Sequence, residues 1–169
     1  MKRRIYVTTS IPYVNAAPHV GFALELVQAD ALARASRLLG REVRFQTGTD
    51  ENAAKNVLAA AELNLATQEL VDRNSHKFHE LLTALNVSAD DFLRTTEGRH
   101  RRGVHALWQG LRPGDIYRKQ YRGLYCTGCE DFYLEKDLVD GRCPEHGTRP
   151  VEVAEENYFF RLSAYQRQI

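Results

Sequence analysis

The chain has 169 residues, of which 43% are hydrophobic, and this is enough for one domain with a buried core and a small second lobe. Its 23 basic and 22 acidic side chains nearly cancel, which excludes nucleic-acid binding driven by bulk positive charge. No stretch approaches the roughly 20 apolar residues of a membrane span, and the basic start lacks the apolar core of a signal peptide. We therefore expect a cytoplasmic protein with neither a membrane nor a DNA partner.

The first 50 residues predict a strand, a helix and a second strand. Residues 4–9 and 43–47 are short, β-branched and aromatic, as strands are. Between them, apolar residues recur three and four apart from Val20, and Gly40 is a plausible helix stop. Strand, helix and strand form a βαβ unit, whose strands run parallel. The expected fold class is therefore α/β, built on a parallel sheet.

The remaining chain alternates further helices and strands. Helices are expected at residues 52–62, 67–85 and 97–111. Strands are expected at residues 91–95, 116–125 and 157–161. Thr67 is the expected N-cap of the second of these helices.

Three cysteines and one histidine follow the pattern C-x2-C-x13-C-x2-H. They are Cys126, Cys129, Cys143 and His146. Each two-residue spacing can present two side chains to one metal ion, and a thiolate-rich set with one imidazole suits tetrahedral zinc. Because all four ligands come from the protein, no position remains for a reactive water, and the expected single zinc is structural. The alternative is three unpaired buried cysteines beside an incidental surface histidine.

Two loops at the carboxyl edge of the expected sheet carry the chemistry of a nucleotide site. His19 can donate a hydrogen bond to phosphate oxygens at the start of a helix, where Gly21 permits close approach to the backbone, or it could be a satisfied structural residue. Asp50 ends the second strand at the same edge and could fix a ligand ammonium group, or it could cap the next helix. Ile11 and Tyr13 could wall the pocket, or they could be ordinary loop anchors.

Several segments together resemble the methionyl-tRNA synthetases, from about Arg4 to Tyr165. The matching segments are YVTTSIPYVN (6–15), PHVG (18–21), FQTGTD (45–50), FLRTT (92–96), GDIY (114–117), GLYC (123–126) and ENYFFR (156–161), together with the cysteine cluster. This resemblance implies a class I aminoacyl-tRNA synthetase, a ligase of protein biosynthesis. Its Rossmann-type catalytic core is interrupted by a connective insertion with a zinc knuckle.

The resemblance also implies domains, a reaction and roles for single residues. Residues 1–114 would be the N-terminal half of the core, 115–161 the insertion, and 162–169 the start of a truncated helix. The reaction would join methionine to ATP, which enters with magnesium, and then transfer methionine from the adenylate to tRNA. The implied ATP contacts are Pro18, His19 (the catalytic residue), Gly21 and Phe22. The implied methionine contacts are Ile11, Tyr13 and Asp50, with Asp50 on the ammonium group.

The chain departs from the family pattern in three ways. Phe22 replaces the second histidine of the ATP signature, and losing one transition-state donor costs on the order of 10²–10³ in rate. Asn52 and Ala53 replace a usual His-Gly pair. The chain stops at Ile169 without the family's K-M-S-K-S loop or anticodon-binding domain, so we expect the isolated chain to be weak or inactive. A second chain that supplies the other half is a candidate partner.

Two other functions compete with methionine activation. One is a divergent synthetase paralogue, or a nucleotidylyltransferase, that activates another acid. The other is a non-catalytic module that binds RNA or a partner protein through the knuckle and the basic run at residues 99–102, although such a run is more often a solvated helix face.

Overall fold

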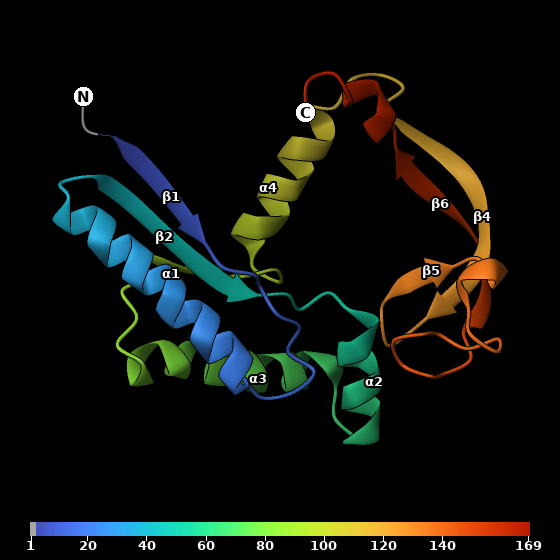
Figure 1. Cartoon of the computed structure of the whole chain (residues 1–169), viewed down its shortest axis with the longest axis horizontal. Helices are drawn as coiled ribbons and strands as arrows, with labels where there is room; N and C mark the ends of the chain where they lie inside the picture. Colours follow the sequence, from blue (N-terminus) through green and yellow to red (C-terminus); the bar gives the residue numbers. More distant parts are fainter. Residues whose placement is uncertain (1–2) are drawn as a thin grey trace. The chain divides into compact units, whose positions relative to one another are not determined.

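The computed structural model describes residues 3–169, and it separates into two compact units. The first unit ends at Val104 and the second begins at His105. A parallel sheet with helices builds the first unit, and an antiparallel ribbon builds most of the second (Figure 1). Within the described residues, no helix combines the length and the apolar character needed to cross a bilayer.

Three parallel strands form the sheet of the first unit. They are β1 (Arg4–Thr8), β2 (Glu42–Thr49) and β3 (Asp91–Arg94), in the order β1-β2-β3. Val7 lies opposite Phe45 in the first pair, and Thr47 lies opposite Phe92 in the second. All three carboxyl ends therefore meet at one edge of the sheet. This arrangement confirms the predicted α/β fold with a parallel sheet.

Three helices connect and cover these strands. They are α1 (Val20–Leu38), α2 (Ala54–Glu62) and α3 (Thr67–Ala84). On α1, Ala33 packs with Val7 and Phe45 of the sheet. Near the start of α1, Phe22 meets Phe78 of α3 edge to face, with ring centroids 5.3 Å apart. Burying side chains of this size stabilises a fold by about 1.5–3 kcal/mol each, so these contacts fix α1 between the sheet and α3.

The start of α3 differs from its prediction. Thr67 is the first helical residue, and the N-cap is Ala66, which makes no side-chain capping bond. The predicted threonine cap is therefore wrong by one position. The first turn instead carries Glu69, whose negative charge is favourable near the partial positive charge of a helix N-terminus.

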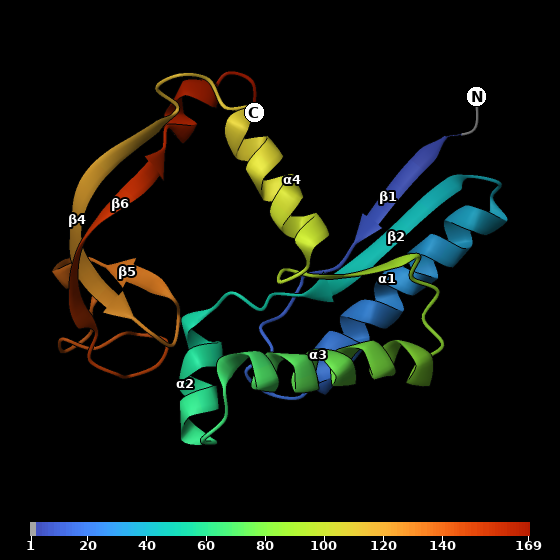
Figure 2. The same cartoon turned by 180° about the vertical axis from the view of Figure 1, so that it is seen from behind.

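The second unit contains a long two-stranded ribbon with a short third strand. β4 (Ile116–Cys126) pairs antiparallel with β6 (Val151–Phe160) on one side and with β5 (Asp131–Tyr133) on the other (Figure 2). Before it, α4 (Gly98–Gln109) includes residues of both units, and none of its side chains is buried. Single 3-10 turns lie at Glu135–Asp137 and Leu162–Tyr165.

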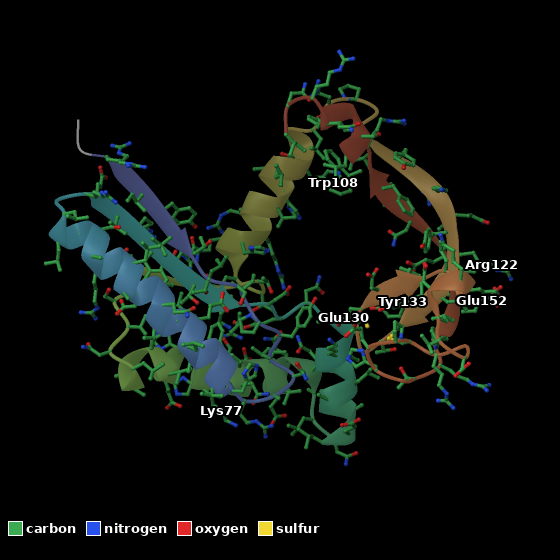
Figure 3. All side chains as sticks on the ribbon, in the orientation of Figure 1. Lys77, Trp108, Arg122, Glu130, Tyr133 and Glu152 are labelled. Carbon is green, nitrogen blue, oxygen red and sulfur yellow. The ribbon has the colours of Figure 1, made fainter. Side chains whose placement is uncertain are left out.

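β6 begins six residues earlier than the sequence pattern indicates, at Val151 instead of residue 157. Three of the six added residues are acidic and five are exposed, so they do not resemble a half-buried strand. Exposed ion pairs join them to β4: Arg122 lies 2.7 Å from Glu152, and Figure 3 shows these two side chains together. Diagonal pairs of this kind contribute to antiparallel pairing, and a single segment does not reveal them.

The second unit buries very little. Among residues 105–169, the buried side chains are those of Cys126, Cys143 and Asp115. Rings on one face of the ribbon pack together, with Tyr121 and Phe132 centroids 4.6 Å apart, but these rings stay half exposed. A sheet of this size with no apolar core usually needs a disulfide or a metal to hold it.

Candidate metal and substrate sites

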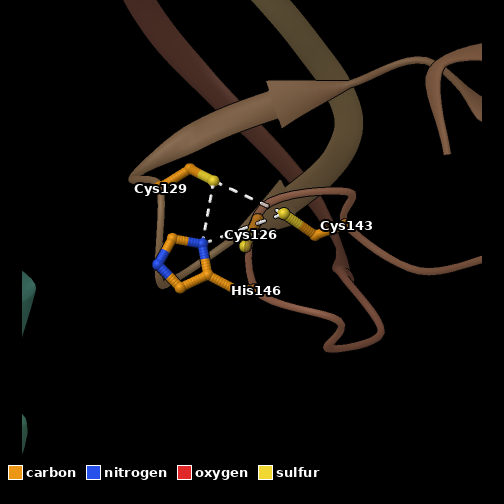
Figure 4. Close-up of side chains that lie close together, drawn as sticks. All are labelled: Cys126, Cys129, Cys143 and His146. Carbon is orange, nitrogen blue, oxygen red and sulfur yellow. Dashed lines mark hydrogen bonds between the residues drawn. The ribbon is translucent and has the colours of Figure 1, made fainter. Parts of the chain in front are cut away.

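The four predicted metal ligands lie together in the second unit. Their ligand atoms all fall within 4.8 Å of one another (Figure 4). Cys129 Sγ lies 3.4 Å from Cys143 Sγ, and His146 Nδ1 lies 3.1 Å from Cys129 Sγ. A tetrahedral ion with Zn–S bonds of about 2.3 Å would hold its ligand atoms about 3.8 Å apart. The cluster therefore has the donor set and the size to hold one metal ion.

Two similar backbone turns present these ligands. In the first, the N–H of Glu130 donates to the carbonyl of Cys126 at 2.8 Å, and in the second, Gly147 N–H donates to the carbonyl of Cys143 at 2.8 Å. Both donor residues have positive φ, 54° and 64°. Each turn thus brings its two ligands to one side, as the two-residue spacing predicts.

Gly128 makes room for the imidazole. A Cβ at this position would lie 2.6 Å from the ring of His146, which is closer than non-bonded carbon atoms approach. The glycine inside the first turn is therefore needed for the histidine of the second turn to reach the cluster.

Hydrogen bonds and crowding of thiols shift the cysteine pKa values in different directions. Backbone N–H groups, led by that of Cys129, lower the pKa of Cys126. Burial raises the pKa of Cys143, but backbone donors led by His146 N–H outweigh it and lower the pKa to about 7. The Tyr133 hydroxyl lowers the pKa of Cys129, yet burial and the neighbouring thiols raise it to about 11. Three thiolates this close repel one another, and a bound cation would relieve that repulsion.

The first loop and Asp50 meet at the carboxyl edge of the parallel sheet. Asp50 N–H donates to the carbonyl of Pro12 at 2.9 Å, and Tyr13 forms an isolated parallel bridge with Asp50. Ile11 and Tyr13 are each 37% exposed. The structure thus brings these three proposed methionine contacts to one side of the first unit.

The Asp50 carboxylate is anchored through one oxygen. Its Oδ1 accepts from the backbone N–H of Asn52 at 3.0 Å and from the Thr95 hydroxyl at 3.4 Å. The helix that follows is capped at Ala53 without a side-chain bond, so Asp50 is not its N-cap. Neither bond involves Oδ2, which can therefore accept from an additional donor.

The sequence pattern predicted no role for Glu51, the acidic residue next to Asp50. The Glu51 side chain is fully buried, and its Oε1 and Oε2 accept from Arg94 Nε and Nη2 at 2.5 and 3.1 Å. The Thr96 hydroxyl also donates to Glu51, while Asp72 binds the same guanidinium. The hydrogen bond to Glu51 raises the pKa of Arg94, which therefore stays charged. The segment FLRTT contained the only sequence signal for this pair.

His19 is the N-cap of α1. Its Nδ1 accepts from the backbone N–H of Gly21 at 3.0 Å, so in the neutral ring Nε2 carries the proton and can donate outward. A Cβ on Gly21 would lie 2.9 Å from His19 Cε1. Gly21 therefore leaves room for the capping ring of His19. The sequence had suggested only that it lets a nucleotide approach the backbone.

The other two proposed ATP contacts differ in accessibility. Pro18 is half-buried beside His19. Phe22 is 4% exposed and packs in the core with Leu26 and Phe78. Its side chain therefore faces the core, and only its backbone remains for a ligand at this end of α1.

Known proteins match this chain over nearly all of its length. Residues 5–150 match the family described as tRNA synthetases class I (M). The methionine–tRNA ligase of Rhizobium meliloti (strain 1021) is 47% identical over 170 residues, which cover 97% of this chain and 33% of that protein. The corresponding protein of Caldanaerobacter subterraneus subsp. tengcongensis is 46% identical over 98% of this chain and 26% of its own length.

A solved structure agrees with these relatives. Mycobacterium tuberculosis methionyl-tRNA synthetase in complex with methionyl-adenylate superposes with a TM-score of 0.91 at 45% identity, covering 98% of this chain and 34% of that one. The chain thus spans between 26% and 34% of the length of these proteins. From the family match, the identities and the shared fold together, we conclude that the chain belongs to the class I tRNA synthetases (M), the methionyl-tRNA synthetase family.

Proposed function

We propose that the protein containing these residues is a methionine–tRNA ligase that forms methionyl-adenylate from methionine and ATP and transfers methionine to tRNA. One observation carries this proposal: nearly the whole chain superposes on a synthetase that holds methionyl-adenylate. The magnesium that accompanies ATP in such reactions belongs to the same proposal.

The loop residues of the first unit suit the amino-acid half of this substrate. Asp50 presents a carboxylate at the carboxyl edge of the sheet, where folds of this class bind ligands. An opposite charge within about 4 Å contributes on the order of 1–4 kcal/mol near a protein surface, which is enough to orient an ammonium group. Ile11 and Tyr13 offer apolar surface next to it for an uncharged side chain.

The start of α1 suits the phosphate half. His19 directs Nε2–H outward, at a helix end with partial positive charge. A donor there would stabilise charge that builds on the α-phosphate oxygens during attack by the methionine carboxylate. The protein groups position and stabilise the reactants and form no covalent bond to them.

We further infer that Cys126, Cys129, Cys143 and His146 bind one structural zinc ion. Support comes from the Cys3His donor set, the tetrahedral spacing and the lack of an apolar core around it. With four protein ligands, the ion would hold the insertion together and take no part in the reaction. The unpaired thiols suit a reducing compartment, in keeping with our proposal that the protein is cytoplasmic. The assignment of residues 1–114 to the core, 115–161 to the insertion and 162–169 to a further helix is part of the same proposal.

A paralogue with altered activity is the second candidate. Its support is Phe22, which fills the core where the family signature has a histidine and so adds no phosphate donor. Such a protein would keep the fold and the metal site but would activate its acid slowly, or activate another acid.

ATP–pyrophosphate exchange with a panel of amino acids tests both candidates. The assay uses this chain alone and together with any separately encoded chain that completes it. Methionine-dependent exchange that Asp50→Asn abolishes supports the ligase, and exchange with a different acid supports the paralogue. If no acid supports exchange even when the completing chain is present, while the chain binds RNA tightly, both are wrong and a non-catalytic module is favoured.

A further inference from the structure

The three thiolates of the proposed metal site obtain hydrogen bonds from different sources. Cys126 and Cys143 each begin a turn, and backbone N–H groups of that turn lower their pKa values, while the Thr148 hydroxyl lies 3.8 Å from Cys126 Sγ. Cys129 ends its turn, and its leading hydrogen bond comes from a side chain, the hydroxyl of Tyr133. A ligating thiolate with few donors is a stronger nucleophile and a less precisely oriented ligand.

The position of Tyr133 is set by β5. This strand has three residues and ends at Tyr133, which pairs with Leu124 of β4. The pairing places the Tyr133 hydroxyl 3.1 Å from Cys129 Sγ. A metal-bound thiolate has no proton, so the hydroxyl is the donor in this contact.

Cys129 is also the accessible thiol of the three. Cys126 and Cys143 are each 1% exposed, whereas Cys129 is half-buried. Reagents and oxidants would therefore reach Cys129 before the other two cysteines. A donor at this sulfur therefore acts on the most accessible of the three thiolates.

We propose that Tyr133 is a positioning residue of the metal site, whose hydroxyl orients the Cys129 thiolate toward the ion and lowers its nucleophilicity. This role rests on the proposed zinc site. Partners of metal ligands commonly change metal affinity by about 10–100-fold. A three-residue strand such as β5 adds little pairing to the sheet. Its structural role is therefore to hold Tyr133 beside Cys129.

The test compares Tyr133→Phe with Tyr121→Phe, a matched removal of a phenol hydroxyl in the same unit. Tyr121 packs between Phe132 and Phe159 and keeps those ring contacts as phenylalanine. Zinc affinity is measured by competition with a chromophoric chelator. The alkylation rate of each cysteine in the zinc-loaded chain is measured with iodoacetamide and mass spectrometry. The thiolate-to-metal absorption band of the cobalt-loaded chain provides a spectroscopic readout.

For Tyr133→Phe we expect about a tenfold loss of zinc affinity, in line with other partners of metal ligands. We also expect faster alkylation at Cys129 alone and a shifted cobalt band. Tyr121→Phe should match the wild type in all three measurements. Equal behaviour of the two variants would overturn the role of Tyr133, as would an equal rise in alkylation at all three cysteines. Failure of the wild type to bind zinc would overturn the metal site itself, and the role of Tyr133 with it.

Discussion

Replacing Arg94 by methionine should strongly destabilise the first unit. The change keeps much of the side-chain volume but leaves the Glu51 carboxylate buried without its cation. Glu51 has a fully buried side chain, and the Arg94 side chain is 28% exposed. Breaking a buried pair by removing one partner costs about 3–5 kcal/mol. Because Thr49 and Thr96 still donate to Glu51, we expect about 3 kcal/mol, the lower end.

Urea denaturation followed by far-ultraviolet circular dichroism measures this loss. Arg4→Met is the matched control, since the ion pair of Arg4 with Glu42 has side chains 82% and 60% exposed. An exposed pair contributes about 0–1 kcal/mol, so the control should unfold nearly as the wild type does. The double variant Arg94→Met with Glu51→Gln should recover part of the loss, because no buried charge remains. If Arg94→Met costs no more than Arg4→Met, the buried Glu51 carboxylate does not depend on Arg94 for compensation of its charge.

Two further predictions concern Gly128 in the first turn of the cysteine cluster and Asp30 of α1. Gly128→Ala should displace the His146 ring, which a Cβ would approach to 2.6 Å, and should lower zinc affinity at least about tenfold. Gly103→Ala, which meets nothing within 4 Å, should leave that affinity unchanged, and equal chelator competition by both variants would contradict the steric argument. At Asp30, burial raises the pKa, but hydrogen bonds led by those from Ser88 outweigh it and lower the pKa below 3.8. Because the folded-state pKa is depressed, this stabilisation is present above the unfolded pKa of about 3.9 and is lost as the pH falls through the folded value. Asp30→Asn should therefore unfold at lower urea than the wild type at pH 7, with the gap narrowing below about pH 4, and a gap that does not change with pH would refute the linkage.

Local spacing was sufficient to predict the metal cluster and the βαβ unit. Two ligands separated by two residues lie on one turn whatever the rest of the chain does, so the cysteine pattern alone identified Cys126, Cys129, Cys143 and His146. Likewise, the apolar periodicity of α1 and the short β-branched strands on either side of it depend on nearby residues.

Contacts between distant residues could not be predicted in the same way. The Glu51–Arg94 pair joins residues 43 positions apart, and the sequence around either residue does not indicate which residue pairs with it. Neither the acidic half of β6 nor the bond from Tyr133 to Cys129 was predicted, because both depend on pairing with β4. Phe22 illustrates the same limit. Its position in the chain suggested a ligand contact, but its side chain is buried in the core against Phe78.

The residue types along the chain thus determined the Cys3His cluster, the parallel sheet and the loops that could hold a substrate. The tertiary structure decided the direction in which each side chain points. It also decided which partner neutralises or hydrogen-bonds each buried polar group. Burial and hydrogen bonding are properties of a whole packed unit, so the hydrogen-bonding roles of His19 and Asp50, and the buried Glu51 beside them, emerged only once the strands and helices were placed together.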